Sequence, residues 1–448
     1  LVNNRIKDIS NNNYVNELGG NGIYEFGAAF WNNEIDYNKF YVTRSDTANF
    51  KILRNMLQAP NATFGDDPLS IERQIKNDSP EHRWNIILIS VESLSGSYLK
   101  RFGNTENITP YLDSLIPHAL CFDRFYATGT RTVRGLEALS LAIPPTPGQS
   151  IVRRPDNEDM FTMGSVLKTK GYDVDFIYGG NSFFDNMGKF FSNSSYQVLD
   201  ERDIPDSLVH LTTAWGADDE ASLNFTLQQA DKSFSNGKPF FNHIMTLSNH
   251  RPYTYPEGRI DRLPSYQTSQ GAVKYTDYAI NKFIKDAQQR PWFNNTLFVI
   301  VADHCAQSAG KTDLPVNRYH IPCIIYAPQL IKPAIEKRLV SQIDLAPTIL
   351  GLMNLSYTSL FFGYDIYHMI GGNERAFIST YQDMGYMKDE NMIILSPRRK
   401  VQQVKPDFFT GVNKAGTKSD NLVNEAIAWY QGANFQYKSG KYKRVKAN

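Results

Sequence analysis

Two apolar segments of the sequence end in residues that are costly to bury. The segment NIILISVE (85–92) stops at Glu92, and TLFVIVADH (296–304) stops at Asp303 and His304. Short apolar runs of this kind are typical of parallel strands, and ligands bind beyond the carboxyl ends of such strands. Two carboxylates and an imidazole crowded at one edge repel or desolvate each other unless a cation lies among them. The pattern therefore predicts a divalent metal site.

The expected ion follows from the ligand types. An oxygen-rich set favours Mn²⁺ or Mg²⁺, with Zn²⁺ or Ca²⁺ as alternatives. A simpler interpretation of one acidic strand end is a carboxylate that caps a neighbouring helix. That interpretation is weaker for two strands together, so we prefer the metal.

The loop YATGTRTVRG (126–135) supplies candidate nucleophiles. Among its side chains are the hydroxyls of Thr130 and Thr132 and the guanidinium groups of Arg131 and Arg134. A threonine alcohol is a poor nucleophile until coordination to a cation lowers its pKa. Arginines beside it suit the oxygens of phosphate or sulfate. Taken by itself, the loop fits equally a turn whose arginines are solvated.

Histidines and cysteines elsewhere give weaker signals. His250 follows an apolar segment in TLSNHRPYTYP (246–256) and has the chemistry to protonate a leaving group, although a lone histidine is more often structural. We expect His320 to be structural and Cys305 to be a packing residue.

Alternating strand and helix patterns run from residue 85 to residue 353. Helices are indicated by ITPYLDSLI (108–116, with Thr109 as its N-cap), MGSVLKTKGY (163–172), SLNFTLQQADKSF (222–234), YTDYAINKFIKDAQQR (275–290) and IDLAPTILGLM (343–353). Strands are indicated by DVDFIYGG (173–180), PFFNHIMTLSNH (239–250) and IPCIIYAP (321–328) as well as by the two acidic-ended segments. The order predicts an α/β fold with a mostly parallel sheet and helices on both faces.

The flanking regions have a different character. Residues 1–80 are interpreted as an N-terminal helical segment that ends in a linker, QAPNATFGDDPLS (58–70). Residues 81–370 form the predicted catalytic domain, and 371–448 a small β-rich C-terminal subdomain.

Composition narrows the function classes. The 448 residues carry a formal net charge of +1, which argues against nucleic acid as a partner. Three scattered cysteines give no disulfide framework. No apolar run reaches the ~18 residues of a membrane helix. Because the chain begins with Leu1, we expect a targeting or membrane-anchoring part to have been removed.

Several motifs, in order, resemble the sulfatase-like branch of the alkaline phosphatase superfamily. They are NIILISVES, NITPYLDSL, CFDRFYATGTRT, SNHRPY, VADHCAQSAGK, IPCIIYAP and QIDLAPTILGL, over roughly residues 83–365. Within that branch the chain looks most like the lipoteichoic acid synthase and phosphoglycerol transferase group.

The resemblance implies roles for particular residues. The metal ligands of the family match Glu92, Thr132, Asp303 and His304. Because the family nucleophile follows a basic residue, Thr132 after Arg131 is selected over Thr130. Arg131 and the substrate-contacting His250 would share the transition-state charge.

A pocket for the head group is also implied. The family segment G-N-x-x-x-aromatic matches GGNSFFDN (179–186), so Asn181 and Phe184 are expected to contact substrate. Gram-positive synthases have Trp and Arg where this chain has Phe184 and Asn186, so the resemblance does not determine the identity of the head group.

The expected enzyme is a membrane-anchored, extracytoplasmic bacterial phosphoglycerol transferase. Thr132 would take the glycerol phosphate head group from a phospholipid donor and pass it to a glycan or polymer acceptor. A phosphatase, a phosphodiesterase, a sulfuric ester hydrolase and a non-catalytic envelope-binding domain stay open. The C/S-x-P-x-R motif of true sulfatases is absent from the nucleophile loop, TRTVRG, which argues against sulfate esters.

Overall fold

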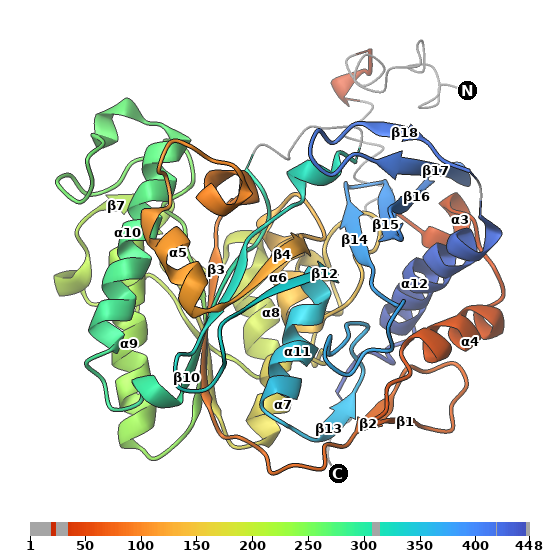
Figure 1. Ribbon diagram of the computed structural model, residues 1–448, viewed down its shortest axis with the longest axis horizontal. Helices are drawn as coiled ribbons and strands as arrows, with labels where there is room; N and C mark the ends of the chain where they lie inside the picture. Colours follow the sequence, from red (N-terminus) through yellow and green to blue (C-terminus); the bar gives the residue numbers. More distant parts are fainter. Residues whose placement is uncertain (1–18, 24–34, 307–313, 418, 445–448) are drawn as a thin grey trace.

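A computed structural model describes residues 19–23, 35–306, 314–417 and 419–444. Its centre is an eight-stranded sheet with the strand order β12-β4-β11-β10-β3-β9-β5-β6 (Figure 1). The strands are β3 (Asn85–Val91), β4 (Leu120–Tyr126), β5 (Asp173–Tyr178), β6 (Gln197–Leu199), β9 (Phe240–Met245), β10 (Thr296–Ala302), β11 (Cys323–Tyr326) and β12 (Ala334–Ser341). Only β11 runs antiparallel to its neighbours in this sheet, so the predicted mostly parallel sheet is confirmed.

The central strands are buried along their whole length. Every residue of β3, β9 and β10 is buried, as expected for parallel strands covered on both faces. β3 and β10 pair in parallel, with Ala302 opposite Val91. The residues that follow, Glu92 and Asp303, therefore leave the sheet side by side.

Helices cover both faces of the sheet, as predicted. Figure 1 shows two groups of helices, one on each side of the sheet. The first group is α5 (Pro110–Leu115), α9 (Asp219–Ser235) and α10 (Ser269–Ala287), and the second is α6 (Thr132–Leu141), α7 (Met163–Thr169), α8 (Met187–Asn193) and α11 (Leu345–Leu352). No helix within the described ranges is long and apolar enough to cross a bilayer.

A second, antiparallel sheet follows the central one in the sequence. It consists of β14 (Ala376–Ser379), β15 (Met384–Lys388), β16 (Asn391–Ser396), β17 (Lys400–Pro406) and β18 (Asn413–Ala415). The C-terminal β-rich region is thus confirmed, but the sequence did not predict the long helix α12 (Asp420–Lys438) behind it. The N-terminal helices α3 (Tyr37–Phe40) and α4 (Asp46–Met56) pack against α12.

One continuous hydrophobic core joins these regions. Phe50 of α4, Ile89 of β3 and Trp429 of α12 all belong to it. The boundaries at residues 80 and 370 stay a prediction. Residues 1–18 and 24–34 of the predicted N-terminal helical segment lie outside the described ranges.

One local prediction was wrong, and a second is correct in position but not in its hydrogen bond. The segment 58–70 was expected to be a linker, but it contains β1 (Ala62–Phe64), which pairs with β2 (Arg73–Ile75) and through it with β13 (Tyr357–Ser359). A strand of three residues is too short to show a pattern. Thr109 occupies the N-cap position of α5 without capping it, because Asp277 of α10 accepts the N–H groups of Tyr111 and Leu112 instead.

Candidate active site

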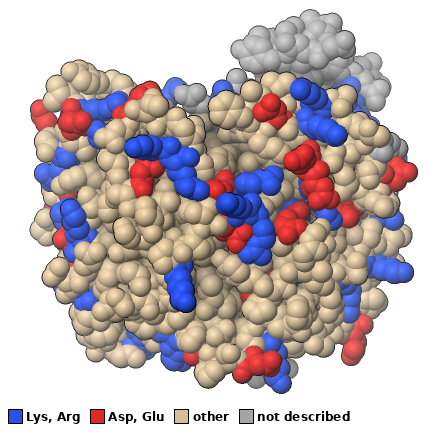
Figure 2. Space-filling view, in the orientation of Figure 1, with Lys and Arg blue, Asp and Glu red and all other residues tan. Residues whose placement is uncertain are grey.

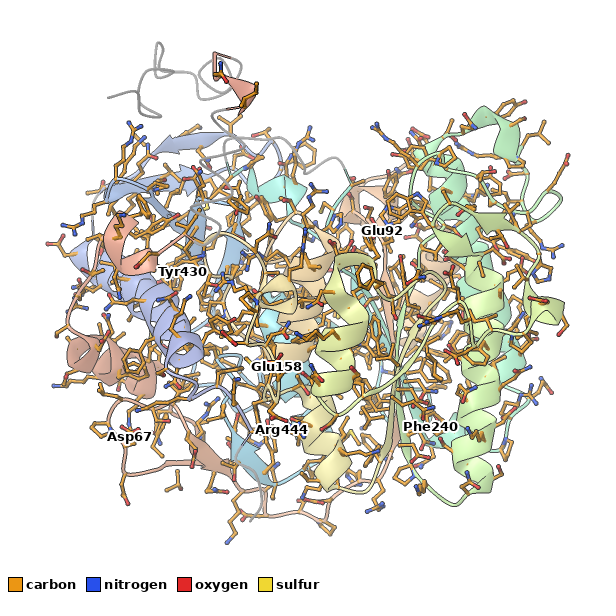
Figure 3. All side chains as sticks on the ribbon, turned by 180° about the vertical axis from the view of Figure 1, so that it is seen from behind. Asp67, Glu92, Glu158, Phe240, Tyr430 and Arg444 are labelled. Atoms are coloured by element: carbon orange, nitrogen blue, oxygen red, sulfur yellow. The ribbon has the colours of Figure 1, made fainter. Side chains whose placement is uncertain are left out.

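Glu92, Asp303 and His304 meet at the carboxyl edge of the central sheet. All three are buried, and one potential ligand atom from each lies within 4.8 Å of the others. Figure 3 shows Glu92 at one end of the sheet and Phe240, the first residue of β9, at the other. The convergence predicted from two acidic strand ends follows from the pairing of β3 with β10.

The hydrogen bonds at this cluster leave one acidic atom without a partner. Asp303 Oδ1 accepts the N–H groups of Ser93 (2.9 Å) and His304 (2.6 Å), whereas the buried Oδ2 accepts none. His304 Nε2 lies 3.5 Å from that Oδ2 and 3.7 Å from Glu92 Oε1. His304 Nδ1 lies 2.9 Å from the Cys305 carbonyl oxygen. In the tautomer that carries its proton on Nδ1, this nitrogen donates to the carbonyl, and the lone pair of Nε2 is available to a metal ion. An orphaned carboxylate oxygen beside a second carboxylate and an imidazole fits a divalent cation.

The electrostatics of the cluster support the same interpretation. Burial, and then the adjacent Glu92 carboxylate, raise the pKa of Asp303 well above its ordinary value. Burial also acts against ionised Glu92, but the charges of His304 and His250 outweigh it and lower the pKa of Glu92. Two ionised carboxylates this close together are costly to bury unless a positive charge lies beside them.

Thr132 begins helix α6 and points at the cluster. Its hydroxyl donates to Glu92 Oε2 over 3.0 Å. Arg131, the residue before it, is exposed in the N-cap position of α6. A Cβ on Gly135 would overlap the backbone of Asp303, so only glycine lets the first turn of α6 approach the metal-ligand strand this closely.

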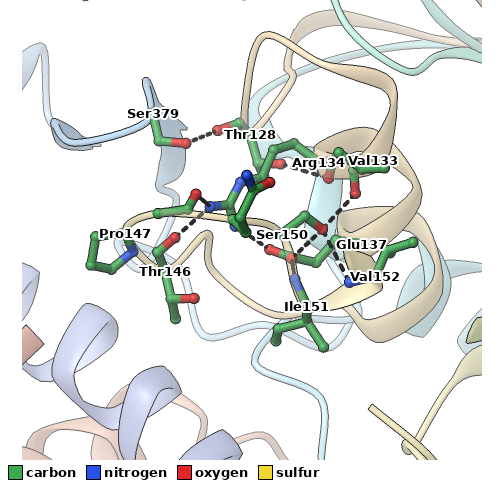
Figure 4. A network of polar contacts seen from close by, with 12 residues as sticks. Thr128, Val133, Arg134, Glu137, Thr146, Pro147, Ser150, Ile151, Val152 and Ser379 are labelled. Carbon is green, nitrogen blue, oxygen red and sulfur yellow. Dashed lines mark hydrogen bonds and ion pairs between the residues drawn. The ribbon is translucent and has the colours of Figure 1, made fainter. Parts of the chain in front are cut away.

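Arg134 points away from the cluster, into a second network (Figure 4). Its guanidinium pairs with Glu137 (2.8 Å) and donates to the carbonyls of Thr146 and Gly148 (2.6 Å each). Glu137 Oε2 in turn accepts the Ser150 hydroxyl. The sequence left both loop arginines available to an anion, but Arg134 is a buried structural residue.

Gln342, the first residue of the motif QIDLAPTILGL, braces the two halves of the site, a role that the motif did not indicate. Its Nε2 donates to the carbonyls of Ala302 and Asp303, and its Oε1 accepts the N–H of Thr128 (3.1 Å). The Ser379 hydroxyl donates to the carbonyl of the same Thr128 (2.8 Å; Figure 4). The nucleophile loop is thus tied to β10 and to the antiparallel sheet.

His250 lies on the solvent side of the cluster, with its Nε2 3.4 Å from Glu92 Oε2. Its ring stacks on Trp215, with the centroids 4.1 Å apart. Trp215 comes from the turn between β7 (Thr212–Thr213) and β8 (Gly216–Ala217), and its Nε1 donates to the Arg251 carbonyl. Phe184 meets Trp215 edge-on at 5.6 Å. Trp215 is a second residue whose role the sequence did not indicate.

The other predicted residues have local roles. Asn181 is exposed, and its side chain accepts the N–H of Phe183, so it shapes the loop that presents Phe184. Cys305 is buried, with its thiol against the His320 carbonyl, and His320 Nε2 lies 2.9 Å from the Asp123 carbonyl. Both are packing residues, as expected.

Comparisons with known proteins agree with this geometry. The Sulfatase family model matches residues 84–355. The chain is 25% identical over 302 residues to lipoteichoic acid synthase-like YvgJ of Bacillus subtilis, which spans 60% of this chain and 47% of the relative. It is 24% identical over 282 residues to phosphoglycerol transferase I of Escherichia coli. This match spans 58% of this chain and 36% of that relative. The chain thus covers about half or less of the length of these relatives.

Two solved structures extend the comparison. A protein in the alkaline phosphatase superfamily from Vibrio parahaemolyticus has a TM-score of 0.86 at 30% identity and covers 92% of this chain and 100% of that one. The lipoteichoic acid synthase LtaP of Listeria monocytogenes has a TM-score of 0.70 at 17% identity and covers 89% and 99%. The family that the motifs indicated is confirmed: the chain belongs to the Sulfatase family of enzymes, within the alkaline phosphatase superfamily.

Proposed function

We propose that the chain is the catalytic part of a metal-dependent phosphoglycerol transferase. It would move a glycerol phosphate head group from a phospholipid to a glycan or polymer of the bacterial envelope, through a phospho-threonine intermediate. One observation carries the proposal: the Thr132 hydroxyl donates to Glu92 inside a buried cluster of two carboxylates and an imidazole. The matched lipoteichoic acid synthases and phosphoglycerol transferases support the choice of group transferred.

Glu92, Thr132, Asp303 and His304 would hold the ion, Mn²⁺ or Mg²⁺ by ligand type. When bound, such an ion neutralises the two carboxylates and lowers the pKa of an alcohol beside it.

Thr132, His250 and Arg131 have different roles in the first half of the proposed reaction. The Thr132 oxygen loses its proton to solvent and bonds to phosphorus, while the bond from phosphorus to the diacylglycerol oxygen breaks. His250, which faces solvent beside Glu92, donates a proton to that leaving oxygen. Arg131 at the start of α6 binds the phosphoryl oxygens.

The second half reverses these steps. An acceptor hydroxyl gives its proton to His250 and bonds to phosphorus, and the bond from phosphorus to the Thr132 oxygen breaks. Thr132 then regains a proton. Water in place of the acceptor would make the enzyme a phosphodiesterase, so release of glycerol phosphate without an acceptor measures that competing reaction.

Two aromatic side chains beside His250 form one wall of the proposed pocket for a small head group. Phe184 and Trp215 pack edge to face next to the imidazole. Asn186, which stands where Gram-positive synthases have arginine, donates to the Val152 carbonyl. Another arginine is close to this position, because Arg153 pairs with Asp185 of the same loop at 3.2 Å.

The location follows from the donor. A phospholipid head group and an envelope acceptor place the catalytic part outside the cytoplasm, in the periplasm or on the outer face of the inner membrane. An N-terminal anchor outside this chain would hold it at the bilayer.

Mass spectrometry of a trapped intermediate tests the proposal. The protein is incubated with labelled phosphatidylglycerol and Mn²⁺, and a phosphoglycerol adduct is expected on Thr132. Thr132→Ala should abolish the adduct, and Thr130→Ala, two residues away, should retain it. An adduct on another residue, a phosphate-only adduct, or a strong preference for sulfate esters would contradict the proposal.

A further inference from the structure

We propose that the carboxyl edge of the central sheet is a membrane-docking surface. Exposed apolar side chains from three loops would enter the interface of the bilayer that contains the donor lipid. We define the docking surface by Phe183, Leu263, Tyr266, Phe409 and Val412. The inference rests on the proposed phospholipid donor but adds a surface outside the catalytic cluster.

Strand direction places these loops at one edge. Phe183 lies in the loop after β5, and Leu263 and Tyr266 lie between β9 and α10. Since β5 and β9 run parallel to β3, both loops leave the sheet at the end where Glu92 lies.

The third loop reaches the same edge from the antiparallel sheet. The Phe409 carbonyl accepts Asn317 Nδ2 (3.1 Å), and Asn317 lies in the connection that follows the carboxyl end of β10. In Figure 1, β18 and the start of α10 stand at the same upper end of the molecule. The space-filling view shows this end hollowed between two raised sides, with basic and acidic side chains around the hollow (Figure 2).

The β17–β18 turn holds its apolar residues outward in a fixed shape. Asp407 Oδ1 accepts the N–H groups of Phe409 and Thr410, and its N–H donates to the Val412 carbonyl. Phe408 packs inward against Tyr126. Phe409 is 88% exposed as a result. A turn fixed before binding loses little conformational entropy when it meets a surface.

Charge at the base of the turn fits an anionic surface. Lys405 and Lys414 face each other across β17 and β18, an arrangement that is unfavourable between like charges. In the described part of the chain neither lysine lies within ion-pair distance of an acid. Asp407 of the same turn, whose carboxylate accepts two N–H groups, offsets part of the Lys414 charge. Anionic lipid head groups would offset this repulsion, and lysines beside exposed aromatic residues are typical of interfacial binding.

The test is co-sedimentation of the chain with vesicles of phosphatidylethanolamine and phosphatidylglycerol. Wild type is expected to bind. The double variant Phe409→Ser with Val412→Ser should bind about tenfold more weakly, because two apolar side chains no longer leave water. Lys405→Glu with Lys414→Glu should weaken binding to these vesicles more than to phosphatidylcholine vesicles.

Phe234 provides the matched control. It is 45% exposed at the C-terminal end of α9, whose N-terminal Asp219 bonds to the loop after β9, so it lies toward the opposite edge. Phe234→Ser should bind vesicles like wild type. Equal loss in this variant, absence of binding in wild type, or a concentration-dependent dimer that the Phe409 and Val412 changes abolish would overturn the docking surface.

A water-soluble donor separates this inference from the proposed function. With monomeric short-chain phosphatidylglycerol, the Phe409 and Val412 variant should form the Thr132 adduct as fast as wild type. Slower formation would contradict a docking role. Wild-type vesicle binding with no adduct on either donor would refute the transferase and leave the surface standing.

Discussion

Two clusters in this molecule each bring one histidine and two carboxylates within ligand distance, and they differ in what surrounds them. One is the active-site cluster of Glu92, Asp303 and His304. The other, which we call the α9 cluster, consists of His210, Asp218 and Glu220 at the start of α9.

The α9 cluster is compensated from within the protein. Asp218 accepts the N–H groups of His210, Leu211 and Ala221 and the hydroxyl of Tyr275. Glu220 pairs with the Arg259 guanidinium at 2.7 Å. A cation would have to displace these donors, so this cluster is a structural one.

The active-site cluster has acidic charge in excess of its donors. Asp303 Oδ2 is buried without a hydrogen-bond partner, and within the described residues no lysine or arginine pairs with Glu92 or Asp303. Residue types at ligand distance therefore do not distinguish the two clusters. The distinction lies in whether the protein supplies the opposite charge.

The largest expected effect is on the transfer rate, after loss of the nucleophile beside the active-site cluster. Thr132→Ala should lower the rate of head-group transfer at least about a thousandfold, because no other hydroxyl donates to Glu92 from α6. Initial rates with labelled phosphatidylglycerol measure it. Thr130→Ala is the control and should keep the wild-type rate. A near wild-type rate in Thr132→Ala would contradict Thr132 as the nucleophile.

Metal addition should stabilise the protein through one cluster only. At about a hundred times its Kd, Mn²⁺ is expected to raise the free energy of unfolding by about 2.7 kcal/mol. Thermal unfolding with Mn²⁺ and with a chelator measures this. Asp303→Asn should lose the response, and an unchanged response in that variant would place the ion elsewhere.

Removing an acid from the α9 cluster should affect stability instead. Asp218→Asn turns one accepting oxygen into a donor among donors, at an expected cost of about 2 kcal/mol in the free energy of unfolding. Denaturant unfolding measures it. The metal response should stay intact, and its loss would remove the contrast between the clusters.

The smallest effect concerns the support of His250. Trp215→Leu removes the stacked ring and should lower the maximal transfer rate by about tenfold, with a smaller rise in KM because Trp215 also lines the proposed head-group pocket. Trp215→Phe keeps a ring in place and should recover most of the rate. If both variants behave alike, the stacking does not position His250.

Much of the fold and part of the site were predictable from sequence. The apolar runs of β3 and β10 and the acids after them indicated both a parallel sheet and the place where ligands converge. A continuous apolar run is typical of a strand covered on both faces, and alternating strands and helices make such strands parallel. The family motifs selected Thr132, which the structure brings to Glu92.

Contacts between distant segments were not predictable. Gln342 lies 214 residues after Thr128 in the sequence, yet its side chain joins that loop to Asp303, and no local pattern marks an amide for that purpose. Trp215 reaches His250 from a turn of irregular sequence. Arg134 sits two residues from the nucleophile, yet the helical turn directs it inward to Glu137.

Metal stoichiometry tests the central claim most directly. Wild type, Asp303→Asn and Glu220→Gln are each equilibrated with Mn²⁺ by dialysis, and bound metal is measured by elemental analysis. We predict one tightly bound ion per chain in wild type and Glu220→Gln, and none in Asp303→Asn. Metal retained in Asp303→Asn, or lost in Glu220→Gln, would contradict the assignment of Glu92, Asp303 and His304 as the metal centre beside Thr132.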